Sequence, residues 1–224
     1  MRIEPTFLFD LDGTLVDSVY QHVLAWKEAL DAEGIALSVW RIHRKIGMSG
    51  GLFTNQLLRE TELEISPELV ARLRRRHAEA YLRYAPSVRP LPGAIALLAW
   101  LTQAGIPWAV ATSANMETAV VTLATLGVDP AQATVVTRDQ VKYAKPDPDL
   151  FLTAAARLGA PIGNALVIGD SIWDMLAARR GGALGVGLLS GGYGLDELRY
   201  AGALRVYDDP DDLLRHIDEV AGRR

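Results

Sequence analysis

Three acidic side chains stand just after short apolar runs of the sequence, where they could bind a metal ion. Asp10 and Asp12 follow the apolar run 7–9, and Asp170 follows the run 165–168 and one glycine. Carboxylate oxygens are hard ligands that suit Mg²⁺. Zinc fits less well, because the chain has no cysteine and only four scattered histidines. The sequence therefore predicts a Mg²⁺ site with Asp10, Asp12 and Asp170 as its ligands.

Hydroxyl and ammonium groups follow other apolar runs and could bind an anion beside that metal. Thr112 and Ser113 follow the run 106–111, and Lys145 lies in the loop 144–148 before a helical pattern. Together with backbone N–H groups, these side chains could hold phosphate oxygens. A cation site that faces an anion site suits phosphoryl transfer, which depends above all on positioning and charge neutralisation.

Two carboxylates two positions apart could perform the covalent steps of such a transfer. An aspartate beside the metal can attack phosphorus and form an aspartyl-phosphate. A second acid two residues away can protonate the leaving group and then activate water. Asp10 and Asp12 have this spacing.

The elements that must position these residues alternate between apolar runs and helical patterns. Fully apolar strands that alternate with helices are typical of a parallel sheet covered on both faces. Ligands of such sheets bind beyond the carboxyl ends of the strands, where the polar residues described above would meet. The predicted strands are residues 7–9, 106–111, 134–136, 165–168, 183–186 and 204–206, and the predicted helices are 93–104, 116–126, 148–158, 172–180 and 210–220.

Residues 17–84 interrupt this alternation with helical patterns and no convincing strand. Apolar residues within 19–30 recur at spacings of four, three and four, which places them on one face of a helix. A second apolar stripe within 69–84 follows a helix cap and first turn that begin at Ser66. The simplest interpretation is a helical insert after the first strand.

The first acidic motif, DLDGTLVDS at residues 10–18, resembles the first signature of the haloacid-dehalogenase-like (HAD) phosphatase superfamily. The other three motifs follow in the order of that family: Thr112, Lys145 within KPDP, and GDSIWD at residues 169–174. The resemblance covers essentially the whole chain. In the type of core and of cap, the chain resembles the phosphoglycolate phosphatase and β-phosphoglucomutase-like members of the superfamily.

The resemblance implies an α/β fold with a Rossmann-like, doubly wound parallel sheet as its core. A small all-helical cap domain would be inserted after the first strand, over the active site. We therefore expect a discontinuous core domain of residues 1–16 and 88–224, and a cap domain of residues 17–87.

The resemblance also implies a role for each matching residue. Asp10 would be the nucleophile and a metal ligand, and Asp12 the general acid/base, whose backbone carbonyl also binds the metal. Thr112 would bind the phosphoryl group by a hydrogen bond, with Ser113 as a further phosphate contact. Lys145 would neutralise charge on the nucleophile and the phosphate.

Two more aspartates would complete the metal site by the same resemblance. Asp170 would bind Mg²⁺ directly, whereas Asp174 would orient the water shell of the metal or Lys145.

Residues of the cap could contact the substrate. The segment 41–51 is basic and then glycine-rich. In capped members of the family, a loop at this place contacts the leaving group of the substrate. A solvated helix end is the alternative interpretation. The candidate contacts are His22, Arg44, Lys45 and Gly47. The arginine run 72–76 is instead expected to form a solvated helix face, and Trp26 to pack in a core.

Composition excludes several classes of protein. The chain has 224 residues, of which 50% are hydrophobic, and its 23 basic and 27 acidic residues give a net charge of −4. It therefore lacks the basic surface of a nucleic-acid binder. The apolar run 94–101 is far shorter than the roughly 20 residues that span a membrane, and the N-terminus turns acidic too early for a signal peptide. We expect a cytoplasmic monomer or homodimer with neither membrane nor nucleic-acid partner.

The predicted function is hydrolysis of a small phosphorylated metabolite by a Mg²⁺-dependent phosphatase, a phosphoric monoester hydrolase. A sugar phosphomutase is the first alternative, because His22 and Trp26 resemble the arrangement in β-phosphoglucomutase. Gly50 stands where that mutase would have arginine, however, and the mutase's cap lysine would fall near His77. The substrate stays open among phosphoglycolate, a sugar phosphate, a nucleotide and a polyol phosphate.

Two further alternatives conflict with the motifs. A haloacid dehalogenase on the same fold lacks the second acid and needs no metal, so Asp12 and Asp170 argue against it. A catalytically silent binding module would have damaged motifs, and all four are intact.

Overall fold

The computed structural model describes residues 5–48, 50–60 and 66–221. Within these residues six strands form one sheet in the order β5-β4-β1-β6-β7-β8, and every neighbouring pair is parallel. This confirms the predicted α/β core. The strands are β1 (Thr6–Phe9), β4 (Trp108–Ala111), β5 (Val135–Val136), β6 (Ala165–Gly169), β7 (Leu184–Leu188) and β8 (Ala203–Tyr207).

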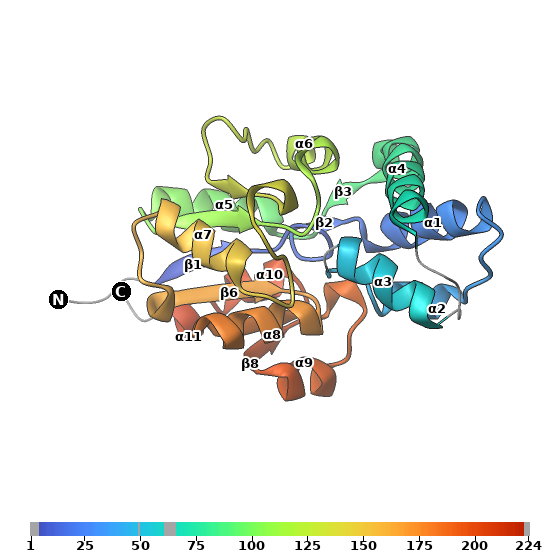
Figure 1. Ribbon diagram of the computed structural model, residues 1–224. Coiled ribbons are helices and arrows are strands. Elements are labelled where there is room, and N and C mark those ends of the chain that lie inside the picture. The colour runs from blue at the N-terminus through green and yellow to red at the C-terminus, as the bar shows by residue number, and fades with distance from the viewer. Residues whose placement is uncertain (1–4, 49, 61–65, 222–224) are drawn as a thin grey trace.

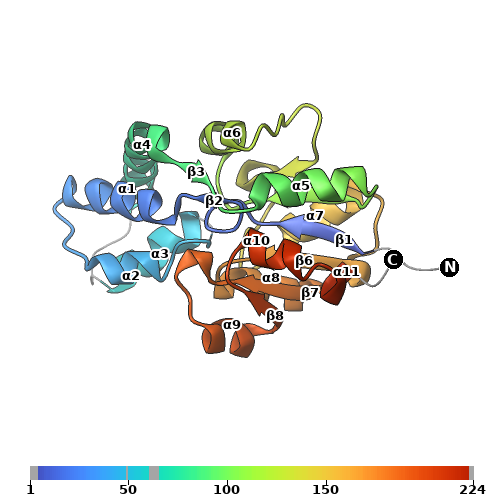
Figure 2. The same cartoon turned by 180° about the vertical axis from the view of Figure 1, so that it is seen from behind.

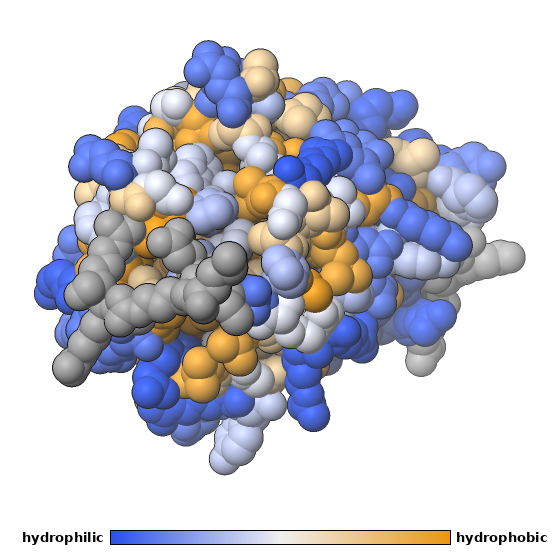
Figure 3. All heavy atoms as spheres, turned by 90° about the vertical axis from the view of Figure 1, so that its left-hand side faces the viewer, coloured by the Kyte–Doolittle hydropathy of each residue, from blue (hydrophilic) through white to orange (hydrophobic). Residues whose placement is uncertain are grey.

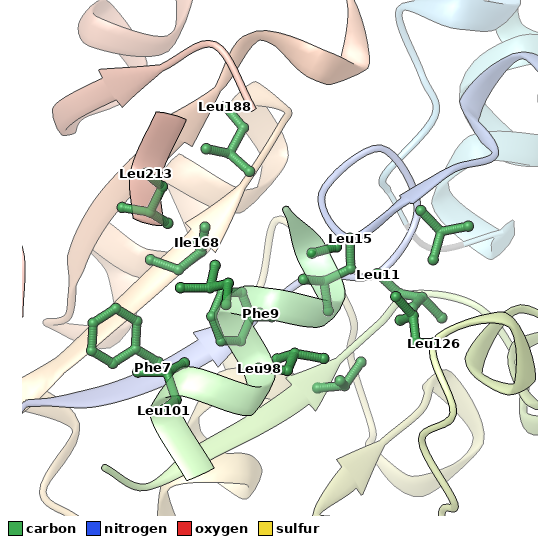
Figure 4. Close-up of a cluster of buried hydrophobic side chains, with 14 of the residues drawn as sticks. Phe7, Phe9, Leu11, Leu15, Leu98, Leu101, Leu126, Ile168, Leu188 and Leu213 are labelled. Carbon is green, nitrogen blue, oxygen red and sulfur yellow. The ribbon is translucent and has the colours of Figure 1, made fainter. Parts of the chain in front are cut away.

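Helices cover both faces of this sheet (Figures 1 and 2). Alternate side chains of β1 point to opposite faces, as its pleat requires, so that Phe7 and Phe9 join one buried cluster and Leu8 joins another. Figure 4 shows the first cluster, to which α5 and α10 contribute leucines. The core helices are α5 (Ala94–Gln103), α6 (Met116–Thr125), α7 (Asp149–Arg157), α8 (Ile172–Gly181), α9 (Leu195–Ala201), α10 (Pro210–Arg215) and α11 (Asp218–Ala221), with 3₁₀ turns at Ala85–Ser87, Arg138–Gln140, Ile162–Asn164 and Leu189–Gly191.

The C-terminal part of the chain differs from the prediction in two places. The segment 210–220 is two short helices rather than one, because α10 ends at Arg215 and His216 leaves the helical conformation. The helix α9 has only seven residues, of which Leu198 alone is buried, so its sequence carries too little periodicity to predict it.

Four further helices lie at the end of the sheet opposite both chain termini (Figures 1 and 2). Both helices predicted for this insert are present, and the hydroxyl of Ser66 caps the second by accepting a hydrogen bond from the backbone N–H of Leu69 at 3.1 Å. The four helices pack around their own buried cluster, which includes Trp26 and Phe53. They are α1 (Val19–Asp31), α2 (Val39–His43), α3 (Gly50–Glu60) and α4 (Pro67–Tyr84).

A short antiparallel pair lies where the chain leaves and re-enters the core. The strands β2 (Val16–Asp17) and β3 (Arg89–Pro90) pair with each other and do not join the main sheet. The sequence pattern does not predict them, because two residues are too few to show alternation. They lie beside the predicted domain boundaries, which stay a prediction.

One end of the molecule has a mixed surface. Figure 3 views the end of the molecule that carries both termini, where hydrophilic side chains surround small hydrophobic patches. In the described part of the chain, no helix has both the length and the apolar character needed to cross a membrane.

Candidate active site

The nucleophile candidate and a metal-ligand candidate lie side by side because their strands are neighbours. Asp10 follows β1 and Asp170 follows β6, and the register of the two strands pairs Phe9 with Ile168. The backbone N–H of Asp10 continues this pairing by donating to the carbonyl of Ile168 at 2.9 Å. The carboxyl ends of the two strands therefore present both carboxylates at one edge of the sheet.

Lys145 is fully buried between two carboxylates. Its Nζ forms one ion pair with Asp10 and another, at 2.8 Å, with Oδ1 of Asp174. Burial alone would lower the pKa of Lys145, but these two carboxylates raise it above its usual value. The ammonium group is therefore charged and holds both acids in place.

Asp174 is fixed by the start of α8. Its Oδ2 accepts hydrogen bonds from the backbone N–H and the hydroxyl of Ser171, at 3.2 and 2.6 Å, in a capping box. A Cβ atom on Gly169 would lie 2.3 Å from the side chain of Asp174. A side chain at residue 169 would thus displace the acid that orients Lys145.

Three buried carboxylates form a candidate metal site. Oxygen atoms of Asp10, Asp170 and Asp174 lie within 4.8 Å of one another. Thr14 donates to Oδ1 of Asp170 at 2.9 Å, and a Cβ on Gly191 would lie only 1.7 Å from its Oδ2, so the backbone packs closely around this acid. The predicted ligand Asp12 does not contribute its carboxylate to this cluster.

The charge of this cluster suits a divalent cation. Burial raises the pKa of Asp10 to about 7 although Lys145 opposes the shift, and burial together with Asp174 and Asp10 raises the pKa of Asp170 well above its usual range. Three acids thus share one ammonium group, and a bound cation would compensate the excess negative charge. An all-oxygen donor set also suits a hard ion such as Mg²⁺.

Asp12 faces a histidine of the inserted helices. Its Oδ1 accepts a hydrogen bond from the hydroxyl of Ser18 at 2.6 Å and lies 3.2 Å from Nε2 of His22. Burial raises the pKa of Asp12, but His22 and Ser18 lower it by more, so that the net shift is downward. His22 in turn places its Nδ1 3.1 Å from Nε2 of His77 and stacks on Tyr81.

The predicted phosphate-binding hydroxyls lie at the end of β4. Oγ1 of Thr112, which is buried, accepts a hydrogen bond from the backbone N–H of Ala114 at 3.0 Å. Ser113 donates to the carbonyl of Gly47 at 3.0 Å, which joins the core to the glycine-rich loop of the cap. Lys145, the third predicted phosphate-binding residue, lies beside Asp10. The predicted phosphate-binding residues and the acidic cluster therefore lie at the same strand ends.

A cavity of about 270 Å³ lies between these strand ends and the inserted helices. Both Asp10 and Asp12 line it, as do Thr112 and Ser113. The residues that line it from the insert are His22, Trp26, Lys45, Ile46, Gly47, Met48, Gly51, Phe53, Arg74, His77 and Ala78.

Three of the four predicted cap contacts line this cavity, namely His22, Lys45 and Gly47. The fourth, Arg44, does not. Its guanidinium forms an ion pair with Glu197 of α9 and lies 4.2 Å from the centre of the Tyr193 ring. Arg44 therefore joins the cap to the core outside the cavity.

Other lining residues were not among the sequence candidates. Trp26 packs in the cap core as predicted but also reaches the cavity. Arg74 and Arg138 line it as well, although the run that contains Arg74 is predicted to form a solvated face. The sequence offers one indication that Arg74 could reach the cavity: it is three residues from His77, so the two side chains share a face of α4.

Comparison with known proteins agrees with this geometry. Hexitol phosphatase A of Escherichia coli is 36% identical over 178 residues, which is 79% of each chain. A phosphoglycolate phosphatase of Agrobacterium fabrum is 33% identical over 196 residues, which cover 84% of this chain and 82% of that one.

The crystal structure of a hydrolase from Pseudomonas syringae superposes with a TM-score of 0.96 at 59% identity, covering 98% of this chain and all of that one. A β-phosphoglucomutase of Clostridium difficile shares the fold, with a TM-score of 0.84 at 23% identity over 97% of each chain. Residues 5–182 match the sequence profile of the haloacid dehalogenase-like hydrolases. The chain therefore belongs to the haloacid dehalogenase-like hydrolase family.

Proposed function

We propose that this enzyme is a Mg²⁺-dependent phosphatase that hydrolyses a small phosphorylated metabolite through an aspartyl-phosphate on Asp10. The observation that carries the proposal is the buried group of Asp10, Lys145, Asp170 and Asp174 at one edge of the sheet. Asp10 of this group lines a cavity that Asp12 also lines. The names of the relatives support the reaction class, since hexitol phosphatase A and phosphoglycolate phosphatase are both phosphatases.

In the first step an oxygen of the Asp10 carboxylate attacks phosphorus, and the bond from phosphorus to the ester oxygen breaks. The ion pair with Lys145 supports this role, because it favours the ionised, nucleophilic form of an acid whose pKa burial raises to about 7. Asp12 in its protonated form gives a proton to the departing oxygen and becomes a carboxylate.

In the second step Asp12 removes a proton from water, which attacks phosphorus and releases Asp10 and inorganic phosphate. The contacts from Ser18 and His22 keep the Asp12 carboxylate aimed at the cavity. They also supply hydrogen bonds that stabilise the ionised form this step requires, which agrees with its lowered pKa.

Asp10, Asp170 and Asp174 are the residues whose carboxylates would hold Mg²⁺, and the backbone carbonyl of Asp12 is the further ligand that the family resemblance implies. When bound, the ion would neutralise charge on the phosphoryl group during its transfer. Thr112 and Lys145 would bind the phosphoryl oxygens from the other side.

The cap limits the access of water to these groups. The contact between Ser113 and Gly47 and the pair of His22 with Asp12 both cross from the core to the inserted helices. Substrate entry would require these contacts to open, and their closure would exclude water during phosphoryl transfer.

The test is phosphate release from a panel of phosphorylated metabolites with Mg²⁺ and with a chelator, by the wild type and by Asp10→Asn. The panel includes hexitol phosphates, phosphoglycolate and β-glucose 1-phosphate. The proposal expects phosphate release that needs Mg²⁺ and is lost in Asp10→Asn. Conversion of β-glucose 1-phosphate to the 6-phosphate without phosphate release would instead establish a mutase, the alternative favoured by the contact of His22 with Asp12.

A further inference from the structure

The four arginines of α4 at 72–76 do not share one environment. Arg72 and Arg76 both pair with Glu33, at 3.1 and 3.0 Å. Arg75 pairs with Glu79 on its own helix at 3.8 Å. Arg74 forms no ion pair with a carboxylate in residues 5–48, 50–60 and 66–221. Among the described residues, it is therefore the member of the run without a carboxylate partner.

Arg74 turns toward the active-site cavity. Its side chain lines the cavity with His77, three residues further along α4. A Cβ atom on Gly51 would lie 2.6 Å from Nη2 of Arg74, so the guanidinium lies against the first turn of α3 in space that a side chain at residue 51 would fill. The guanidinium is thus placed between two cap helices at the cavity wall.

A second guanidinium lines the same cavity from the core. Arg138 begins the 3₁₀ turn Arg138–Gln140, and its Nη1 donates to the backbone carbonyl of Val141 at 2.8 Å. The described residues offer it no carboxylate partner within ion-pair distance. Burial and the nearby charge of Arg138 both lower the pKa of Arg74.

Two other charged groups of the cavity have contacts of their own. Lys45 pairs with Glu60 at 2.6 Å, and Oδ1 of Asp139 accepts a hydrogen bond from the backbone N–H of Met116 at 3.2 Å. Neither Arg74 nor Arg138 pairs with Asp10 or Asp12. An anion that touches both guanidiniums would therefore lie apart from the phosphoryl group at Asp10 but in the same cavity.

We propose that Arg74 and Arg138 form a subsite for a second anionic group, so that the substrate is a phosphate ester that also carries a carboxylate or a second phosphate. Guanidinium groups favour such anions because they form two parallel hydrogen bonds with them. One arginine belongs to the cap and the other to the core, so the bound anion would also hold the cavity closed. The proposal rests on the proposed function for the position of the first phosphate.

The direct test is equilibrium binding of phosphonates, which the enzyme cannot hydrolyse, by isothermal titration calorimetry in the presence of Mg²⁺. The probes are ω-carboxyalkyl phosphonates and alkyl bisphosphonates with one to three methylene groups, each compared with the hydroxyalkyl phosphonate of equal length. The variants are Arg74→Gln and Arg138→Gln, with Arg75→Gln as the matched control on the same helix.

We expect the wild type to bind the best doubly anionic probe about tenfold more tightly than its hydroxyl analogue. Arg74→Gln and Arg138→Gln should each remove most of that preference and leave the affinity for the hydroxyl analogue unchanged, whereas Arg75→Gln should change neither. A preference for carboxylate or for bisphosphonate identifies which anion the subsite takes.

Equal affinity of the wild type for charged and hydroxyl probes would overturn the subsite. So would a loss of affinity in Arg74→Gln that is the same for both kinds of probe. Because the probes are not turned over, this result is independent of catalysis. Absence of phosphate release from every ester would refute the proposed function, while a charge preference that depends on Arg74 would still establish the subsite.

Discussion

Replacing Lys145 by methionine tests whether the active-site acids are held as charged groups in the folded protein. The two side chains have similar length, so the substitution removes the charge while leaving little empty volume. In the wild type the ammonium group pairs with Asp10 and Asp174, and all three residues are buried. The variant keeps these acids and Asp170 together without the cation between them.

The expected loss of stability follows from the burial of the pair. Breaking a buried ion pair by removing one partner costs about 3–5 kcal/mol, because the other charge is left without compensation. For a chain of this size that corresponds to a melting temperature lower by roughly 6–20 °C.

The loss of stability in Lys145→Met should grow as the pH rises. Burial already raises the pKa of folded Asp10 to about 7 against a reference of 3.8, and removal of Lys145 raises it further. A carboxyl whose pKa is higher in the folded than in the unfolded state costs stability as the pH rises. The loss in Lys145→Met should therefore be large at pH 8 and smaller at pH 5, where protonation removes the unpaired charge.

The assay is thermal and urea unfolding in chelator at both pH values. Lys27→Met is the matched control, because Lys27 pairs with Asp31 on an exposed face of α1, where such a pair is worth less than about 1 kcal/mol. A loss in Lys145→Met at pH 8 no larger than in Lys27→Met would mean that Lys145 does not hold charged acids in place, as would a loss that grows as the pH falls.

Three further predictions concern the metal, a glycine and the contact between cap and core. Because the pKa of Asp10 is about 7, protons compete with Mg²⁺ for this carboxylate below that pH. Calorimetry should therefore find the Mg²⁺ affinity about tenfold weaker at pH 6 than at pH 8. Equal affinities at the two pH values would contradict this. Gly191→Ala should weaken Mg²⁺ binding by about 10–100-fold, because its Cβ would lie 1.7 Å from Oδ2 of Asp170, whereas Gly163→Ala, which meets nothing within 4 Å, should bind normally. Tyr81→Phe removes a buried 2.6 Å hydrogen bond between α4 and Thr122 of α6 and should cost about 1 kcal/mol in urea unfolding; an unchanged midpoint would mean that this contact does not stabilise the fold.

The core of the fold could be predicted because each strand is a short apolar run that ends in polar residues. The same pattern predicted that Asp10, Thr112 and Asp170 would meet, since parallel neighbouring strands end at one edge. The elements β2 and α9 could not be predicted, because they have too few residues to show a hydrophobic period.

The partners of charged side chains could not be predicted in this way. Arg44 is a predicted substrate contact of the cap, whereas Arg74 lies in a run that is predicted to form a solvated helix face. Arg44 instead meets Glu197, which is 153 positions away, and Arg74 instead lines the cavity. Which arginine pairs and which remains available depends on how the cap packs on the core. The predicted localisation, oligomeric state and backbone ligation by Asp12 stay predictions.

In the proposed mechanism Asp10 carries the phosphoryl group, and Asp12 activates the water that removes it. The most direct measurement is rapid mixing of Asp12→Asn with p-nitrophenyl phosphate and Mg²⁺, followed by peptide mass spectrometry. Nitrophenolate leaves without needing a proton, so the first step should proceed while the second stalls. We expect a burst of one nitrophenolate per active site and a phosphoryl group on Asp10. Steady turnover without a burst or an adduct, or near-normal turnover by Asp10→Asn, would contradict it.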